Sequence, residues 1–321
     1  MGKIGLLMGK LQVLTRSTIE VENHATSAER LQFYLEAPRE LDIARPPAAS
    51  VPDDWPSRDA LQARRLCARY RPELPLTLHG ISFELSAGSK VGIVGRTGSG
   101  KTTLLQCLLR LVEPGEGSVR LDGVDLQSVS LSTLRRRIAV IPQDPYLWQG
   151  DVRQNIDPLG ICGSEEVNAV LTRARLAPKL RSLLKVADGD DSVPLHSVRV
   201  DDGGSNFSVG EKQLLCFARS MLRTTPRLVI LDEATANIDS ATDRVLQELV
   251  REAFAQATVL IVAHRLQTVS DCDRLLVMGG GRLLASGSPS ELMQRDEDGE
   301  FIIKQLDEVD VSGMDKATNS I

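Results

Sequence analysis

The sequence is poor in aromatic residues and has no excess of positive charge, and this restricts what it can bind. Phe, Trp and Tyr make up 3% of its 321 residues, whereas single-stranded nucleic acids are held largely by bases stacked on aromatic rings. The formal net charge is −5, and a general nucleic-acid binder carries a basic surface. We therefore expect no nucleic-acid partner. A nucleotide remains compatible with this composition, because its site needs positive potential only locally.

Cysteine and histidine are too scattered to predict a metal centre. The cysteines form no CxxC pair and are odd in number, which is typical of reduced thiols in a cytosolic protein. The histidines are equally dispersed. The residues in question are Cys67, Cys107, Cys162, Cys216 and Cys272, and His24, His79, His196 and His264.

Long apolar runs are absent as well. A membrane-crossing helix needs about 18 consecutive apolar residues, and the sequence contains no such run. We therefore expect this chain not to cross a membrane itself. The opening segment is apolar but short, is interrupted by Lys10 and lacks a small-residue cleavage site, so we expect no secretory signal.

The sequence does contain a regular alternation of strand and helix patterns. Hydrophobic residues make up 42% and charged residues 25%, as in soluble globular proteins. Residues 1–40 have helical spacing, with Thr26 or Ser27 as a helix cap. The prolines at 46, 47, 52 and 56 mark an extended linker. From residue 78 onward, strands alternate with helices, which predicts an α/β domain with a mostly parallel sheet. We expect a helical segment and linker over 1–57, a domain over 58–295 with a helical insertion over about 150–222, and a tail over 296–321.

The segment GRTGSGKT matches the phosphate-binding pattern G-x-x-x-x-G-K-[ST]. It follows an apolar strand pattern, KVGIV, and precedes a helical one, which is the context that the motif requires. Glycines let backbone N–H groups curl around phosphate oxygens, the lysine reaches the outer phosphates, and the threonine hydroxyl ligates Mg²⁺. The alternative is a glycine-rich turn without a ligand. The residues that we expect to bind a nucleotide here are Gly95, Arg96, Thr97, Gly98, Ser99, Gly100, Lys101, Thr102 and Thr103.

Two acidic residues follow the apolar strand pattern RLVIL. In open α/β sheets, ligands lie at the carboxyl ends of the strands. Asp232 is therefore expected to orient Mg²⁺, and Glu233 to polarise an attacking water. Taken alone, the pair reads equally well as two surface acids in a turn. The neighbouring phosphate loop favours the catalytic interpretation.

Three further candidates are weaker when each is taken alone. His264 follows the strand pattern TVLIVA and is expected to hydrogen-bond the terminal phosphate and the attacking water, although a histidine at a strand end is more often structural. Gln143 ends another strand pattern and offers a neutral ligand for Mg²⁺ or water. Tyr70 offers a ring face for adenine, although a core or surface tyrosine is the default interpretation.

The segment NFSVGEKQLLCFARSML indicates a second anion site. Small polar residues and Gly210 precede an apolar helix, and the N-terminus of a helix favours anions.

These segments together resemble a known family. GRTGSGKTTLL, Gln143, SVGEKQLLCFAR, LVILDEATANID and His264 occur in the order and spacing of an ATP-binding cassette (ABC) ATPase, over about 58–295. The resemblance implies a P-loop NTPase core with an antiparallel β subdomain and a helical subdomain. It implies ATP and Mg²⁺ as ligands and ATP hydrolysis as the activity. It also implies head-to-tail pairing with a second cassette, whose bound ATP Ser208 and Gly210 would cap. The implied catalytic residues are Glu233, His264 and Lys101, the implied metal ligands are Thr102, Gln143 and Asp232, and the implied adenine-stacking ring is Tyr70.

Finer details are similar to the second cassette of subfamily C, which includes the multidrug-resistance-associated pumps. These details are RYRPELPLTLHGISFEL, GSNFSVGEKQLLCFARSML and IPQDPYLWQGDVRQNIDP. This similarity implies transmembrane domains as partners, a place on the cytoplasmic face of a membrane, and ATP-driven export of a solute. Gln143 and the segment after it would sense the membrane domain, and Asn237 and Asp239 would lie in a loop crossing between cassettes. Since the sequence has neither membrane domains nor a first cassette, we expect a fragment, a truncated paralogue or a separate subunit.

Two departures from the family pattern stand out. Glu211 takes the place of the usual Gln, and a carboxylate there would repel the partner's phosphates unless it points away. The segment DALQARRLCARY is more basic and less apolar than the first strand that belongs there, which weakens the prediction for the sheet edge near the adenine.

Other functions stay open at this point. One is a cassette that senses nucleotide or gates a channel, although Glu233 and His264 favour turnover. Another is a soluble ABC protein of DNA repair or translation, against which the acidic charge and the missing coiled-coil insertion or tandem cassette both count. The last is a non-functional remnant of a transporter gene, against which the intact motifs argue.

Overall fold

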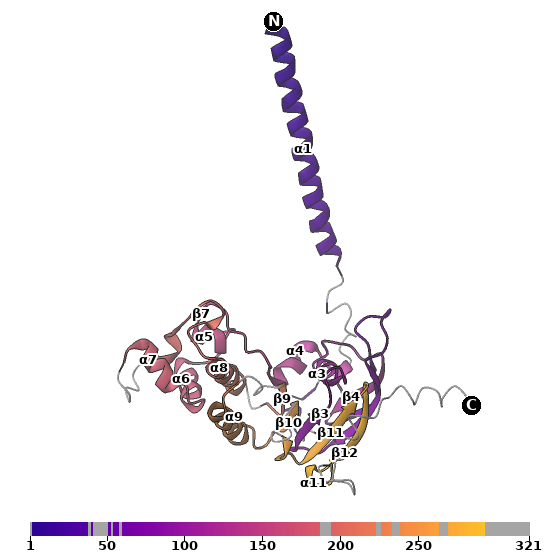
Figure 1. Ribbon diagram of the computed structural model, residues 1–321, viewed down its shortest axis with the longest axis vertical. Coiled ribbons are helices and arrows are strands. Elements are labelled where there is room, and N and C mark those ends of the chain that lie inside the picture. The colour runs from indigo at the N-terminus through magenta and orange to yellow at the C-terminus, as the bar shows by residue number, and fades with distance from the viewer. Residues whose placement is uncertain are drawn as a thin grey trace, which may run out of the picture. The chain divides into compact units, whose positions relative to one another are not determined.

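The computed structural model describes residues 2–37, 40, 51–52, 54–57, 60–186, 194–222, 226–232, 238–262 and 269–292. The chain divides into two compact units, Met1–Pro46 and Pro47–Ile321. Figure 1 shows the elements of both.

The first unit contains helix α1 (Gly2–Glu36). The Thr26 hydroxyl donates to the carbonyl of Glu22 at 3.0 Å, and the Ser27 hydroxyl donates to the carbonyl of Asn23 at 2.9 Å. Both residues therefore lie inside the helix, and the expectation that one of them caps it is wrong. None of the described helices is both long enough and apolar enough to cross a bilayer.

A sheet of six described strands forms the centre of the second unit, in the order β12-β11-β3-β10-β9-β6 (Figure 1). All are parallel except β12, which pairs with β11 as an antiparallel hairpin. This confirms the predicted mostly parallel sheet. The strands are β3 (Lys90–Val94), β6 (Ile138–Ile141), β9 (Leu228–Asp232), β10 (Thr258–Val262), β11 (Arg274–Gly279) and β12 (Arg282–Gly287).

Both faces of this sheet are covered. Along β9, Leu228 and Ile230 pack into one core, and Val229 and Leu231 pack into the other. The first core also contains helix α3 (Lys101–Leu108), and the second contains α8 (Val209–Leu222) and α9 (Ser240–Ala253). Because neither face meets water, the strands consist of continuous apolar runs, which is the pattern that made them recognisable.

An antiparallel sheet, β2-β1-β4-β5, packs over α3 in the first of these cores. Its strands are β1 (Leu61–Ala68), β2 (Leu78–Leu85), β4 (Glu116–Leu121) and β5 (Val124–Asp125). The basic segment DALQARRLCARY supplies β1, which lies between β2 and β4 rather than at an edge. Trp55, assigned to the linker by the sequence analysis, is buried in the same core and donates from Nε1 to the carbonyl of Leu121 at 3.2 Å.

A bulge explains why β1 looks unlike a strand. Its register with both neighbours shifts after Ala63 and Arg64, and Arg65 has a φ of 47°. Arg64 and Arg65 are therefore exposed in succession, which breaks the alternation of buried and exposed residues. On β4, Gly117 has a φ of 82°, and a Cβ there would collide with the carbonyl oxygen of Arg65.

The residues predicted as a helical insertion form α5 (Val152–Ile156), α6 (Ser164–Arg173), α7 (Ala177–Leu184) and α8, with the short pair β7 (Gly150–Asp151) and β8 (Arg199–Val200). Figure 1 shows these helices gathered on one side of the second unit, with α3 and the two larger sheets on the other. The remaining described elements are η1 (Leu126–Ser128), α4 (Leu131–Arg137), η2 (Leu195–Ser197), η3 (Asp202–Gly204) and α11 (Pro289–Leu292).

Candidate functional site

The glycine loop connects β3 to α3 in a conformation that requires glycine. Gly98 and Gly100 have positive φ values of 84° and 96°, which residues with a Cβ rarely adopt. A Cβ on Gly100 would lie 2.8 Å from Leu78 Cδ2, and one on Gly95 would collide with the carbonyl oxygen of Met278. The loop is therefore in close contact with the Leu78 side chain and the Met278 backbone, and a residue with a Cβ fits at neither glycine.

Lys101 is folded over this loop. Its side chain is buried, and Nζ donates to the carbonyl oxygens of Gly95 at 2.7 Å and Arg96 at 3.0 Å. The Leu104 N–H donates to Gly100 O at 2.9 Å, so the helical ladder has begun by this residue. The amides before it belong to the open end of the helix, where donors point outward. The loop thus presents an ammonium group and backbone donors at one place.

Ser99 adds a buried hydroxyl to the same loop. The residue is 4% exposed, and no hydrogen-bond partner reaches its Oγ among the described residues. Buried polar groups normally have partners. An unpaired hydroxyl, an ammonium group and a glycine cradle form a donor set that fits an anion with several oxygens.

The hairpin turn between β11 and β12 supports the loop from the side. Gly281 N–H donates to the carbonyl of Ser99 at 3.1 Å, and His79 N–H donates to the carbonyl of Gly281 at 2.9 Å. A Cβ on Gly281 would collide with the carbonyl oxygen of Thr77. Three glycines in succession, at 279–281, exceed what a hairpin needs and were the available signal of a close contact.

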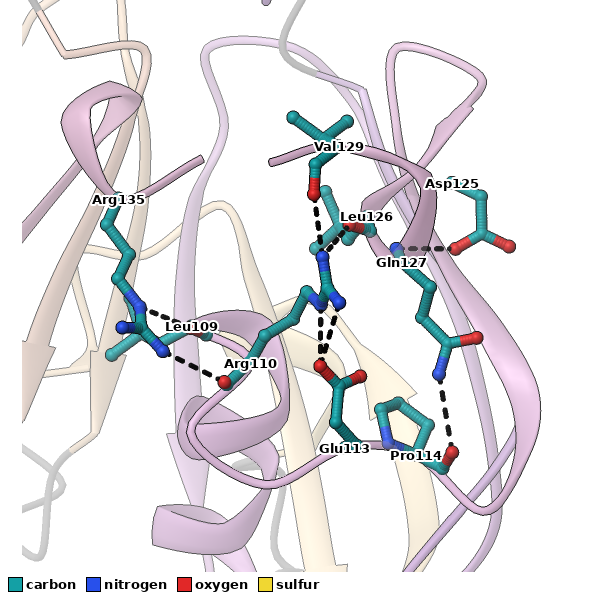
Figure 2. A network of polar contacts seen from close by, with 9 residues as sticks. All are labelled: Leu109, Arg110, Glu113, Pro114, Asp125, Leu126, Gln127, Val129 and Arg135. Carbon is teal, nitrogen blue, oxygen red and sulfur yellow. Dashed lines mark hydrogen bonds and ion pairs between the residues drawn. The ribbon is translucent and has the colours of Figure 1, made fainter. Parts of the chain in front are cut away.

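Two arginines anchor the other end of α3 (Figure 2). Arg110 is 3% exposed and donates to the carbonyls of Leu126 at 3.1 Å and Val129 at 2.7 Å, while pairing with Glu113 at 2.8 Å. Arg135 of α4 donates to the carbonyls of Leu109 at 3.1 Å and Arg110 at 3.0 Å. These carbonyls end a helix and would otherwise lack donors. The network holds α3 in place, and with it the loop at its N-terminus.

The ends of the parallel strands bring the predicted metal ligands to one edge. β10 lies between β3 and β9, with Val262 in register with Ile93 and Asp232. Asp232 is half-buried at the end of β9, while Thr102 and the Gln143 that follows β6 are exposed. Carboxylate, hydroxyl and amide oxygens are the ligand types that Mg²⁺ accepts, so this donor set fits the metal.

The predicted catalytic pair cannot be placed in the same way. Glu233 and His264 lie outside the described residues, as does Asn237. Their roles therefore stay predictions from the sequence.

Tyr70 lies beside the glycine loop. Its hydroxyl is 3.0 Å from Thr103 Oγ1, on the first turn of α3. The residue is 51% exposed, so an apolar ring remains accessible next to the phosphate loop. Its role as an adenine platform stays a prediction.

A capping box begins α8 at the second anion site. Ser208 Oγ accepts from Glu211 N–H at 3.2 Å, and Glu211 Oε2 accepts from Ser208 N–H at 2.7 Å. The carboxylate therefore turns back on its own helix and also pairs with Lys179 of α7 at 3.2 Å. The sequence itself carried this signal, because S-x-x-E before an apolar run is the capping-box pattern.

Gly210 brings α8 close to α9. The residue is buried, and a Cβ there would lie 2.7 Å from Thr242 Cγ2. Thr242 is held by Asp239, which caps α9 by accepting from the amides of Ala241 and Thr242. The Thr242 amide is the main cause that lowers the pKa of Asp239 below its usual value.

Gln213 is a residue that sequence reasoning missed. It is 1% exposed, and its Nε2 donates to the carbonyl of Pro142 at 2.8 Å. This bond connects α8 directly to the residue before Gln143. A buried glutamine on the apolar face of a helix was the signal.

A groove of about 360 Å³ lies between the sheet edge and α8. On one side it is lined by Leu109 and Leu111, which follow α3, and by Val140 and Pro142 at the end of β6. On the other side it is lined by Cys216 and Arg219 of α8. Burial raises the pKa of the Cys216 thiol, so this cysteine is protonated at neutral pH. The Arg219 guanidinium carbon also lies 4.9 Å from the ring centroid of Trp148. Trp148 and Tyr146 are exposed in the segment after Gln143.

A family model described as ABC transporter matches residues 78–236. This chain belongs to the ABC transporter family. The cassettes of this family are ATPases. The P-loop ABC fold predicted from the motifs is confirmed.

Curated relatives confirm the resemblance to subfamily C. The cassette is 41% identical over 287 residues to ATP-binding cassette sub-family C member 2 of Rattus norvegicus, covering 88% of this chain and 18% of that protein. It is 37% identical over 308 residues to bile pigment transporter 1 of Saccharomyces cerevisiae, covering 91% of this chain and 20% of that protein. The chain thus spans about a fifth of the length of these relatives.

A solved structure confirms the fold. It is titled "Structure of a bacterial Atm1-family ABC exporter with ATP bound" and superposes with a TM-score of 0.69 at 29% identity. The superposition covers 88% of this chain and 46% of that one.

Proposed function

We propose that this cassette binds ATP between its own glycine loop and the α8 N-terminus of a second cassette, hydrolyses it, and thereby drives solute export by a subfamily C type transporter. One observation carries the proposal. The two candidate anion sites begin helices that pack on opposite faces of the six-stranded sheet, α3 in one core and α8 in the other (Figure 1). This arrangement supports a division of the contacts in which one phosphate is held by the glycine loop of this cassette and by the α8 N-terminus of a second cassette.

The two sites divide the contacts to the triphosphate. Lys101 is already held at the loop by two carbonyls, and on binding its ammonium group would turn part of its donors to the outer phosphates. Ser208 Oγ accepts from an amide of its own helix, which leaves its O–H to donate to a phosphate oxygen from the partner. Gly210 lets the first turn of that helix approach α9 closely. The half-exposed Tyr70 ring supports the adenine.

Thr102, Gln143 and Asp232 would hold Mg²⁺, whose charge neutralises the phosphates. In this proposal, Glu233 accepts the proton of the attacking water, and His264 donates a hydrogen bond to the terminal phosphate. Hydrolysis removes the group that both cassettes hold, and the pair separates.

The membrane domain of the transporter is the proposed occupant of the groove beside α8. The groove is lined mainly by aliphatic side chains, together with Arg135 and Arg219, and exposed aromatic residues follow Gln143 nearby. A short amphipathic segment suits such a surface. This partner would place the cassette on the cytoplasmic face of a membrane.

The test is ATP-dependent pairing of the purified full chain, followed by sedimentation velocity and by ATPase assays over a range of protein concentrations. Glu233→Gln should retain ATP, stop turnover and accumulate pairs. Ser208→Arg should bind ATP as a monomer but lose both pairing and hydrolysis. Ser182→Arg makes the same change at an exposed site on α7 and should behave like the wild type.

Turnover per molecule that is independent of protein concentration and unaffected by Ser208→Arg would contradict the proposed pairing. Pairing on ATP without measurable hydrolysis would instead favour a nucleotide-sensing cassette.

A further inference from the structure

The charge of Glu211 stands at the end of α8 that the proposed function directs toward the partner's ATP. Its Oε2 accepts from Ser208 N–H at 2.7 Å. A carboxylate at a helix N-terminus is stabilised by the helix dipole. Its negative charge also lies beside Ser208, where in the proposed function the terminal phosphate of the partner's ATP binds.

Lys179 faces that carboxylate from a separate helix. Its Nζ lies 3.2 Å from Glu211 Oε2, and the two side chains are 34% and 24% exposed. The same ammonium group lies 6.0 Å from the ring centroid of Phe207, the residue before Ser208. Lys212, the residue next to Glu211, donates instead to the carbonyl of Gly203 at 2.8 Å. Among the described residues, Lys179 is thus the cation placed to cancel the charge of Glu211.

We infer that Lys179 is a positioning residue for ATP-dependent pairing: it neutralises Glu211, so that the α8 N-terminus accepts the partner's terminal phosphate without repulsion. The inference rests on the proposed function. Like charges brought together across an interface oppose association, and a half-buried pair is screened less than an exposed one. Without Lys179, the carboxylate would still cap α8 but would carry its full charge toward the phosphate.

A double-mutant cycle separates this charge effect from packing. We would measure the ATP-dependent pairing constant of the full chain in the Glu233→Gln background by sedimentation velocity at low salt. Lys179→Met keeps the aliphatic stem over Phe207 and removes the charge, and it should weaken pairing about tenfold. Glu211→Gln keeps a side-chain acceptor for Ser208 N–H and should pair within about twofold of the parent. In the double variant the loss should be restored, because no charge is left to neutralise.

Arg175→Met serves as the matched control. It breaks another ion pair, between Arg175 in the connection from α6 to α7 and Glu248 of α9, at 3.0 Å, and it should leave pairing unchanged. The deficit of Lys179→Met should also shrink in about 0.5 M salt, where the Debye length falls to a few ångström. A packing defect would persist in salt and in the double variant.

The outcomes are distinct. If the Glu233→Gln parent pairs on ATP and Lys179→Met pairs equally well, or if the double variant stays as weak as Lys179→Met, the inference is wrong and the proposed function stands. If the parent itself does not pair on ATP, the proposed function fails and the inference fails with it.

Discussion

Replacing Gly210 with alanine tests how closely α8 must approach α9. A Cβ at this position would lie 2.7 Å from Thr242 Cγ2 and 3.2 Å from Thr242 Oγ1. Carbon atoms in van der Waals contact are about 3.5–4.0 Å apart. The added methyl group therefore fits only if the Thr242 side chain rotates or the two helices separate.

Thr242 is not free to rotate without loss. Its Oγ1 donates to Asp239 Oδ2 at 2.7 Å, within the cap that begins α9. Separating the helices instead strains a packed contact, and overpacking of this kind costs about 1–3 kcal/mol. The higher helix propensity of alanine offsets at most about 1 kcal/mol of this cost. We therefore expect Gly210→Ala to lower the free energy of unfolding by about 1–2 kcal/mol.

Urea unfolding of four proteins measures this directly: the wild type, Gly210→Ala, Thr242→Ser and the double variant. Serine at 242 removes Cγ2 but keeps the hydroxyl that donates to Asp239. The penalty of the alanine should mostly vanish in the serine background, with a coupling energy of about 1 kcal/mol. A Gly210→Ala protein as stable as the wild type, or an equal penalty in both backgrounds, would refute the steric argument.

Three further predictions concern single residues. Tyr70→Phe removes the 3.0 Å contact with Thr103 but keeps the ring, so a fluorescent ATP analogue should bind only about three- to fivefold more weakly. Tyr70→Ala should weaken binding of the analogue further, and equal affinities for the two variants would argue against ring stacking. Lys101→Ala should abolish ATP binding in calorimetric titration while a thermal melt still shows a folded chain, and a retained binding isotherm would contradict its role. Hydrogen bonds from Thr242 and Ala241 lower the pKa of Asp239. The ionised Asp239 cap therefore stabilises the folded state at pH values above the ordinary aspartate pKa, and this stabilisation is lost as the pH falls through the lowered pKa. The gap in urea midpoint between wild type and Asp239→Ala should therefore narrow from pH 7 to about pH 3, and a constant gap would show that the charge of the cap is irrelevant.

The elements around the phosphate loop were predictable because their signals are local. The strands β3, β9 and β10 are buried on both faces, so each shows an unbroken apolar run. The glycine pattern that follows β3 requires left-handed backbone at Gly98 and Gly100, and the structure has it. These features depend on neighbours in sequence, which is why a single sequence sufficed.

Other features depend on contacts that the sequence does not display. β1 was doubtful because a bulge exposes Arg64 and Arg65 in succession, and the matching Gly117 lies on a different strand. The direction of Glu211 was open, although its capping-box spacing was readable. Its ion pair with Lys179 joins two helices and could not be read from spacing. The support of Ser99 by Gly281 joins distant segments in the same way.

Helix α8 connects the parts of the proposed mechanism. Ser208, the residue just before α8, belongs to the second anion site in this proposal. Within the helix, Gln213 bonds to Pro142 beside Gln143, and Cys216 and Arg219 line the groove proposed for the membrane domain. A helix of this length, Val209–Leu222, moves as one body of about 20 Å. A displacement of the groove wall must then shift the anion-binding end as well. We therefore expect a membrane-domain contact to alter ATP-dependent pairing through α8, with Gln213→Ala weakening that coupling while leaving ATP binding to the monomer intact.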